Sequence, residues 1–216
     1  MNKIIFWGAA VQAIVLEEFL DSLDYELVAL FDNNEKVISP FSLVPLYYKE
    51  AGFPEWLKNN SVKDTSYSIA IGGTSGKDRV ELHNMLSTKG LRPISLVHPR
   101  AFVANNAKLS EGCQVLANAA VCARTILGVA TIVNTSANIG YGCVLGNGVH
   151  IAPGVSMAGC VEIGDFSFVG CGAVVLPRVK IGCGSIVGAG AVVTKDLPDG
   201  IVARGVPARI VRENKL

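Results

Sequence analysis

The sequence predicts an α/β domain with a short parallel sheet over residues 1–95, followed by a parallel β-helix domain with a C-terminal tail over residues 96–216. Two observations support this division. In the first part, apolar residues alternate between short strand-like runs and the wider spacing of helices. In the second part, an aliphatic residue or Met recurs at every sixth position, a period that fits neither an amphipathic helix nor an alternating strand. The period changes between Pro93 and Pro99.

The first part opens with a βαβ pattern. An apolar run at residues 3–7 ends at Gly8-Ala9-Ala10, and apolar residues follow at helical spacing over residues 11–19. A second apolar run at residues 27–31 ends at Asp32-Asn33-Asn34. A βαβ unit holds its strands parallel, so we expect the two carboxyl ends to meet at one edge of the sheet.

A third strand is predicted at residues 67–71, where the apolar run ends at Gly72-Gly73. A helix is predicted to follow over residues 76–89. Three prolines mark a looser stretch between the second and third strands: Pro40, Pro45 and Pro54.

The six-residue register of the second part holds over seventeen positions without a slip. These positions are Val97, Val103, Leu109, Val115, Val121, Leu127, Val133, Ile139, Leu145, Ile151, Met157, Ile163, Val169, Val175, Ile181, Val187 and Val193. Small residues often follow them. This pattern predicts a solenoid in which the apolar residue points inward and the small residue turns the corner. At three repeats per coil, seventeen repeats predict between five and six coils.

Composition narrows the class of protein. Half of the residues are hydrophobic, 17% are charged and the formal net charge is +1, so binding to nucleic acid through bulk charge is not expected. Apolar runs at the N-terminus are broken by Gly8, Gln12, Glu17 and Glu18. They resemble neither a signal peptide nor a span of about 20 apolar residues. We therefore expect a cytoplasmic protein without membrane insertion.

All the cysteines lie in the second half: Cys113, Cys122, Cys143, Cys160, Cys171 and Cys183. None forms a CxxC pair and the chain has only three histidines, so a zinc site is not expected and no metal is predicted. We interpret the cysteines as small buried apolar side chains. The alternative is a catalytic cysteine, for which Cys143 is the best candidate.

Several motifs together resemble a known family. The repeat and the segments 190–196 and 205–208 (GAVVTKD and GVPA) resemble the hexapeptide-repeat acyltransferases. The small βαβ domain, His98-Pro99, Val133-Asn134-Thr135 and the VHIAPG segment at residues 149–154 resemble its sialic acid O-acetyltransferase-like subfamily. That subfamily includes bacillosamine- and perosamine-type nucleotide-sugar N-acetyltransferases. The resemblance implies a left-handed β-helix, a homotrimer, acetyl-CoA bound between neighbouring helices, and a nucleotide sugar held by the N-terminal domain.

The chain departs from this family at one position. The family usually carries a His and an acidic residue directly before a Cys, nine residues upstream of a second His. Counting back from His150 places Tyr141 and Gly142 at these two positions, before Cys143. A sugar hydroxyl benefits strongly from a general base, whereas part of a sugar amine is already unprotonated near neutral pH. The missing His therefore favours an amino-sugar substrate. Tyr141 is a weak alternative base, because an unperturbed Tyr titrates near pH 10.

Two polar residues are candidates for the catalytic site beside Tyr141. His150 resembles the family residue that contacts the thioester region of acetyl-CoA, where an Nε2 or Nδ1 donor can polarise the carbonyl or hold the cofactor. Asn134 lies about one coil earlier, so it should stack near His150 and can bond the substrate amine or the acetyl oxygen. The alternatives are a histidine that lines a solenoid corner and one rung of an asparagine ladder. Asn138 is a weaker candidate.

The resemblance also suggests residues for the two ligands. Those expected at acetyl-CoA, besides His150, are Gly159, Gly188 and Ala189 for close backbone approach and Lys195, Arg204 and Arg209 for the phosphates. Those expected at the nucleotide sugar are Gly8, Ala9, Asp32, Asn33, Gly72 and Gly73. The first loop lacks GxGxxG spacing, so a dinucleotide fingerprint is not supported. We interpret it as a loop whose amides approach a phosphate at a helix N-terminus. The alternatives are solvated surface cations and ordinary strand-end turns.

Together these observations predict an acetyl-CoA-dependent N-acetyltransferase for a nucleotide-linked amino sugar, a UDP-4-amino-4,6-dideoxy sugar, in bacterial surface glycan synthesis. The second hypothesis is a sugar O-acetyltransferase, against which the missing base counts. A third hypothesis is a non-catalytic trimeric binding protein. Retention of Asn134, His150 and the intact tail counts against it.

Overall fold

The computed structural model describes residues 1–214. Its contacts form two compact units. The first unit combines Met1–Ile71 with Glu81–Ile94, and the second combines Gly72–Val80 with the residues from Ser95 onward. The second unit therefore includes a short segment, Gly72–Val80, that comes from the middle of the N-terminal part of the sequence.

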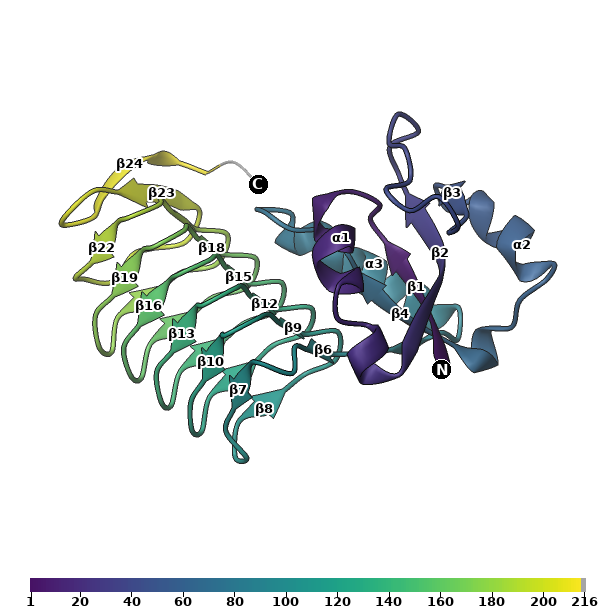
Figure 1. Ribbon diagram of the computed structural model, residues 1–216. Helices are drawn as coiled ribbons and strands as arrows, with labels where there is room; N and C mark the ends of the chain where they lie inside the picture. The colour runs from purple at the N-terminus through teal and green to yellow at the C-terminus, as the bar shows by residue number, and fades with distance from the viewer. Residues whose placement is uncertain (215–216) are drawn as a thin grey trace. The chain divides into compact units, whose positions relative to one another are not determined.

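The first unit contains a five-stranded sheet in the order β3-β2-β1-β4-β5, and every neighbouring pair is parallel (Figure 1). The strands are β1 (Asn2–Trp7), β2 (Tyr25–Asp32), β3 (Leu46–Tyr48), β4 (Thr65–Ile69) and β5 (Arg92–Pro93). The predicted parallel sheet is confirmed. The short edge strands β3 and β5 were not predicted, because runs of two or three residues carry no periodic signal.

The helices are α1 (Val11–Glu17), α2 (Gly52–Leu57) and α3 (Gly76–Thr88), with 3-10 turns at Asp21–Leu23 and Val62–Asp64. Aromatic rings fill the core of the first unit. Trp7 and Phe31 stack with centroids 5.1 Å apart, and Phe31 also contacts Phe53 and Trp56 of α2. This core joins strand residues to a helix that the sequence pattern did not predict.

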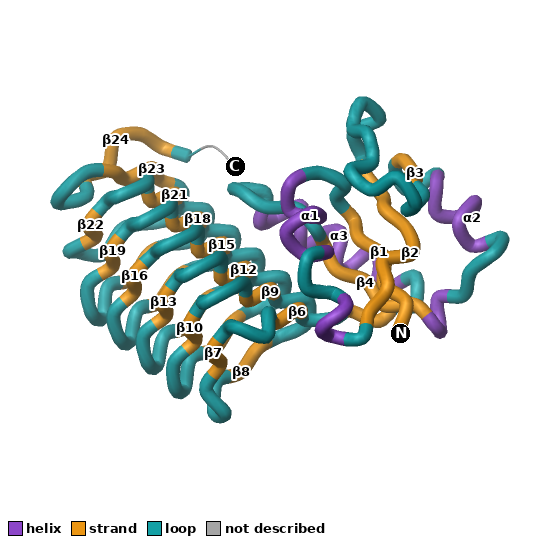
Figure 2. Tube along the Cα trace, in the orientation of Figure 1, coloured by secondary structure: helices purple, strands orange, loops and turns teal. Residues whose placement is uncertain are grey.

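The second unit is a parallel β-helix of two-residue strands (Figure 2). Each of the seventeen register positions is the second residue of one strand. These strands are β6 (Leu96–Val97), β7 (Phe102–Val103), β8 (Lys108–Leu109), β9 (Gln114–Val115), β10 (Ala120–Val121), β11 (Ile126–Leu127), β12 (Ile132–Val133), β13 (Asn138–Ile139), β14 (Val144–Leu145), β15 (His150–Ile151), β16 (Ser156–Met157), β17 (Glu162–Ile163), β18 (Phe168–Val169), β19 (Val174–Val175), β20 (Lys180–Ile181), β21 (Ile186–Val187) and β22 (Val192–Val193).

One coil of the β-helix takes eighteen residues. Ile132 pairs with His150, and His150 pairs with Phe168 in the next coil. The strands stack into three sheets, one for each face. From Val115 onward every register position is buried, whereas Val97, Val103 and Leu109 of the first coil are half-buried. An end coil has a neighbour on one side only, which explains this difference.

The tail is more ordered than the sequence pattern suggested. Beyond the last repeat, β23 (Ile201–Arg204) pairs in parallel with β21, and β24 (Arg209–Glu213) pairs with β23 in antiparallel fashion. The six-residue register ends at Val193, and the sequence predicted only a C-terminal tail here. Among the described residues, no helix has the length and hydropathy needed to cross a membrane.

Candidate functional site

His150 stands at the centre of a polar chain in the second unit. It is 5% exposed and lies in β15. Its Nδ1 is 3.0 Å from the carbonyl oxygen of Gly73, and its Nε2 is 3.2 Å from the amide nitrogen of Asn134. The ring meets that of Phe168 edge-on, with centroids 5.3 Å apart. The imidazole is therefore held on three sides, by two polar partners and one aromatic wall.

These contacts determine the tautomer of His150. A carbonyl oxygen only accepts hydrogen bonds, so Nδ1 carries the proton and donates it to Gly73. Nε2 is then an acceptor for the amide of Asn134. The orientation of that amide is fixed because its Oδ1 accepts from the backbone N–H of Thr135 at 2.7 Å. The N–H of His150 is thus used by Gly73, and in this tautomer the imidazole has no second N–H for the carbonyl of acetyl-CoA.

The pKa of His150 is lowered from 6.5 to about 4. Burial is the largest cause, because it disfavours the charged imidazolium, and the positive charge of Arg79 acts in the same direction. The hydrogen bond to Gly73 opposes the shift. His150 is therefore neutral at physiological pH.

Arg79 is a buried side chain that the sequence reasoning missed. None of it is exposed, and burial lowers its pKa to about 10. Its Nε donates to the carbonyl of Ala130 at 3.1 Å, and Nη2 donates to those of Gly148 at 2.6 Å and Val149 at 3.4 Å. Ala130 and Gly148 are one coil apart. The guanidinium thus joins corner carbonyls of two successive coils, directly before His150.

The segment Gly72–Val80 lies in close contact with the same corner. Gly76 and Gly148 approach so closely that a Cβ on either would collide with the carbonyl oxygen of the other. Gly148 also has a φ of +62°, a conformation that favours glycine. Backbone packing, the arginine and the carbonyl of Gly73 therefore hold this segment against the coil that carries His150.

Tyr141 lies on the corner between β13 and β14, and 59% of it is exposed. Its ring packs over Gly159 in the next coil, where a Cβ would come within 2.6 Å of the ring carbon Cε1. Gly142 follows in the left-handed region, with a φ of +65°. Asn138, the weaker candidate, is exposed in β13.

Comparisons with known proteins identify the family. A family model described as bacterial transferase hexapeptide (six repeats) matches residues 160–195. GDP-perosamine N-acetyltransferase of Escherichia coli O157:H7 is 31% identical over 109 residues, which is 50% of this chain and 48% of that protein. A histidine-to-asparagine mutant of perosamine N-acetyltransferase from Caulobacter crescentus, in complex with CoA and GDP-perosamine, is 31% identical with a TM-score of 0.89. That similarity covers 99% of this chain and 98% of the other. This chain belongs to the hexapeptide-repeat acyltransferases.

A second solved structure extends the similarity. The acetyltransferase domain of PglB from Neisseria gonorrhoeae, in complex with acetyl coenzyme A, is 28% identical with a TM-score of 0.85. The similarity covers 97% of this chain and 99% of that domain. The aligned region spans about half the length of the curated E. coli relative. The left-handed β-helix implied by the resemblance is confirmed by these matches along the whole chain.

In this hexapeptide-repeat acyltransferase, four of the residues predicted at the nucleotide sugar come together in the first unit. The backbone N–H of Ala9 donates to Asp32 Oδ2 at 2.9 Å, and that of Asn34 donates to Asp32 Oδ1 at 2.8 Å. The indole of Trp7 donates to Asn33 Oδ1 at 3.3 Å. Both carboxylate oxygens of Asp32 thus shape the loop after β1 and the turn after β2.

The three glycines predicted at the nucleotide sugar are divided between the two units. Gly8 has a φ of +112°, and a Cβ there would collide with the carbonyl of Ala70. Gly72 and Gly73 belong to the second unit, where the carbonyl of Gly73 meets His150. Gly73, a residue predicted for the sugar, therefore contacts His150, which in turn contacts Asn134 of the predicted catalytic set.

The residues predicted for acetyl-CoA lie along the coils and the tail of the acyltransferase. Gly188 packs against Arg204, whose Cβ is 3.0 Å from where a Cβ on the glycine would stand. Ala189, Lys195 and Arg204 are exposed, and Gly159 is half-buried. The exposed alanine and two cations remain candidates for the cofactor.

The cysteines divide into three classes. Cys113 and Cys143 are buried, Cys122 and Cys160 are half-buried, but Cys171 and Cys183 are exposed. The prediction of buried side chains is wrong for the last two, since they stand at corner positions outside the apolar register. Burial raises the pKa of Cys143, and its thiol donates to the carbonyl of Ala158 at 3.2 Å. A raised pKa opposes thiolate formation, so a catalytic cysteine is not supported here.

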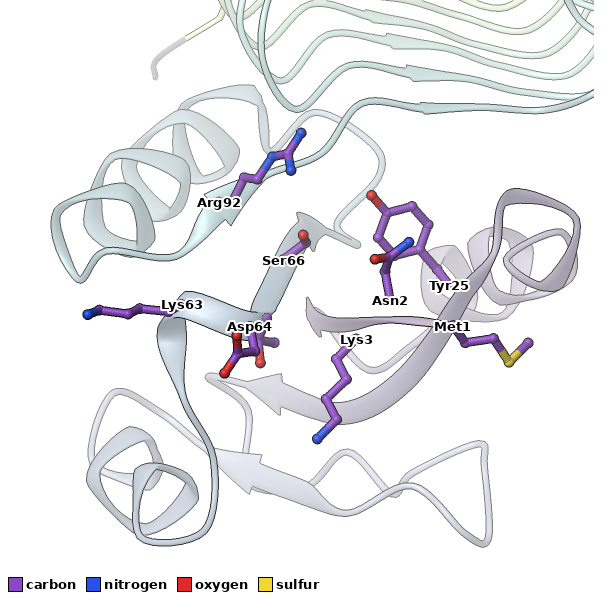
Figure 3. Close-up of a pocket in the computed structure, with 9 residues that line it drawn as sticks. Met1, Asn2, Lys3, Tyr25, Lys63, Asp64, Ser66 and Arg92 are labelled. Atoms are coloured by element: carbon purple, nitrogen blue, oxygen red, sulfur yellow. The ribbon is translucent and has the colours of Figure 1, made fainter.

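One cavity of the first unit lies at the edge of the sheet where the strands begin (Figure 3). It is found where β1, β2 and β4 begin, whereas ligands of parallel sheets bind at the carboxyl ends of strands. Its lining residues are Met1, Asn2, Lys3, Tyr25, Lys63, Asp64, Thr65, Ser66 and Arg92. We therefore do not place the nucleotide sugar there.

Proposed function

We propose that this acyltransferase transfers the acetyl group of acetyl-CoA to the amine of a nucleotide-linked sugar, and that no side chain acts as general base. The observation that supports this proposal most directly is the chain of contacts from Gly73 through His150 to Asn134. It supplies a neutral, rigid site with a spare amide donor. Tyr141 at the position of the family histidine supports the second half of the proposal.

The proposed transfer needs a neutral amine and a hydrogen-bond donor for the developing oxyanion. The neutral amine attacks the thioester carbon and a C–N bond forms while negative charge develops on the carbonyl oxygen. The second N–H of the Asn134 amide is the donor for this oxygen. Collapse breaks the C–S bond, and CoA leaves as a thiolate that takes up a proton from solvent. The proton of the new ammonium passes to water.

Two nucleotide bases, uracil and guanine, are candidates for the substrate. The sequence led us to a UDP-4-amino-4,6-dideoxy sugar, while two relatives bear names that refer to GDP-perosamine. We propose an amino sugar of this general kind for surface glycan synthesis, with GDP-perosamine as the first compound to be tested. Residues Gly8, Ala9, Asp32 and Asn33 at the strand ends are the proposed nucleotide contacts.

The proposal includes a homotrimer in the cytoplasm, where acetyl-CoA is available. Exposed apolar side chains along the β-helix support the oligomer: Phe102, Ile126, Val144 and Leu176. Exposed apolar side chains of this kind favour burial against further copies. Sedimentation should give three times the chain mass at micromolar concentration, and a stable monomer would contradict the trimer.

The experiment measures free CoA thiol released from acetyl-CoA with a panel of UDP- and GDP-linked amino sugars. We expect turnover with at least one amino sugar and none with the matching hydroxy sugar. Turnover with hydroxy sugars would favour an O-acetyltransferase instead. Tight binding of a sugar without release of thiol would favour the non-catalytic hypothesis.

A further inference from the structure

We infer that Arg79 is a positioning residue, which holds the segment Gly72–Val80 on the β-helix so that His150 keeps one tautomer and aligns the amide of Asn134. The inference rests on the proposed function, in which that amide serves the developing oxyanion. Arg79 is not proposed to touch either substrate.

The geometry contains two anchors next to His150. Arg79 donates to the carbonyls of Gly148 and Val149, the two residues directly before His150 in the chain. The carbonyl of Gly73 accepts from the ring of His150. Both anchors belong to one short segment, so a shift of the arginine moves the carbonyl that fixes the imidazole. The segment follows β4 by only two residues, which connects it along the chain to the proposed nucleotide-binding edge.

The chemistry of the guanidinium suits this task. A buried cation is costly unless its donors are satisfied, and Arg79 bonds carbonyls of two coils at once. The planar fork of arginine reaches both, whereas the single ammonium of lysine cannot match that geometry. Its charge also acts on His150 and disfavours the imidazolium, and Asp78 is the charged neighbour that acts on the arginine. The arginine therefore helps to fix the position of the histidine, and its charge adds to the effect of burial in keeping the imidazole neutral.

The consequence lies at Asn134. An Nδ1–H imidazole offers an Nε2 lone pair, which orients one N–H of the amide and leaves the other for a ligand. The opposite tautomer would present N–H to N–H and break the contact. Loss of the arginine should therefore reduce turnover through Asn134 rather than through binding.

The test reads the tautomer directly. The chain has three histidines, so nitrogen NMR of ¹⁵N-histidine-labelled full-length protein should resolve each ring, and His150→Asn identifies the relevant signals. We expect the Nδ1–H tautomer in the wild type. Arg79→Met and Arg79→Lys should give mixed tautomers or a ring that protonates at higher pH. They should lower kcat at least tenfold, with both KM values within about threefold. Lys77→Met, an exposed change two residues away on α3, is the matched control and should leave all readouts unchanged.

A second variant separates positioning from folding. Gly76→Ala forces the segment away from Gly148 while the arginine is kept, so it should mix the tautomers and lower kcat in the same way. If the Arg79 variants fail to fold, this variant decides the question. A pure Nδ1–H tautomer with kcat within twofold of wild type, in a folded Arg79→Met or Gly76→Ala protein, would overturn the inference. The tautomer is read without substrate, so a wild type that transfers no acetyl group refutes the proposed function separately.

Discussion

The β-helix and the first unit differ in the contacts that stabilise each of them internally. In the β-helix, each coil meets the coils eighteen residues before and after it, and its core repeats one aliphatic position per strand. In the first unit, the core joins aromatic residues of distant segments around Phe31. A change in the β-helix should therefore act locally, whereas a change in the aromatic core should affect its whole unit.

The largest expected effect tests this difference. Phe31→Ala removes a ring that contacts Trp7, Tyr47, Phe53 and Trp56, and should destabilise the first unit by about 3–5 kcal/mol. Hydrogen exchange should show lost protection across residues 1–71 and little change in the coils beyond residue 95. As a control, Tyr25→Phe at the start of β2 should change stability by less than about 0.5 kcal/mol. Equal loss of protection in both units would contradict the expectation that a change in the aromatic core affects the first unit alone.

The next effect concerns the site on the β-helix. Asn134→Asp keeps the shape of the side chain but removes the amide donors, so kcat should fall by about 10²–10³-fold, as for loss of an oxyanion donor. Melting of the β-helix should change little, because the substitution is confined to one corner. Steady-state kinetics with both substrates measures this. A change in KM alone would make Asn134 a binding residue.

A smaller effect concerns the stability of the same coil in acid. The folded-state pKa of His150 is lowered to about 4, so between pH 6.5 and pH 4 the unfolded chain binds a proton that the folded chain does not. Stability should therefore fall as pH falls through this window, by up to about 3 kcal/mol from this group. His150→Asn should remove that part of the fall. Denaturant unfolding at pH 7 and pH 4 measures it, and parallel losses in the two proteins would contradict the account.

The same contrast explains what could be predicted from the sequence. Residues from Val97 to Val193 repeat a local rule, so the coils and the neighbourhood of Asn134 and His150 followed from counting. Arg79 follows no such rule. It bonds carbonyls 51 and 69 residues away, and in the sequence it resembles any polar residue of a helix. Because the sequence has no Lys or Arg between Val129 and Val161, the cation that acts on His150 comes from a segment far away in the chain.

Other differences have similar causes. Strands β23 and β24 lie outside the six-residue register, so their pairing had no periodic signal. The two oxygens of Asp32 accept from the backbone N–H groups of Ala9 and Asn34, a structural role that the sequence pattern did not show. The close approach of Gly76 to Gly148 likewise had no sequence signal, because a glycine at the start of a helix is compatible with many surroundings.

The measurement that tests the central claim most directly is the pH dependence of kcat/KM for Tyr141→Phe beside the wild type. If the unprotonated amine attacks without a side-chain base, the mutant should keep turnover within roughly tenfold, far from the ~10²–10⁴-fold loss expected for a removed base. Both profiles should rise with one pKa that belongs to the substrate amine. A thousandfold loss in Tyr141→Phe, together with loss of that pKa from its profile, would contradict the account and make Tyr141 the base.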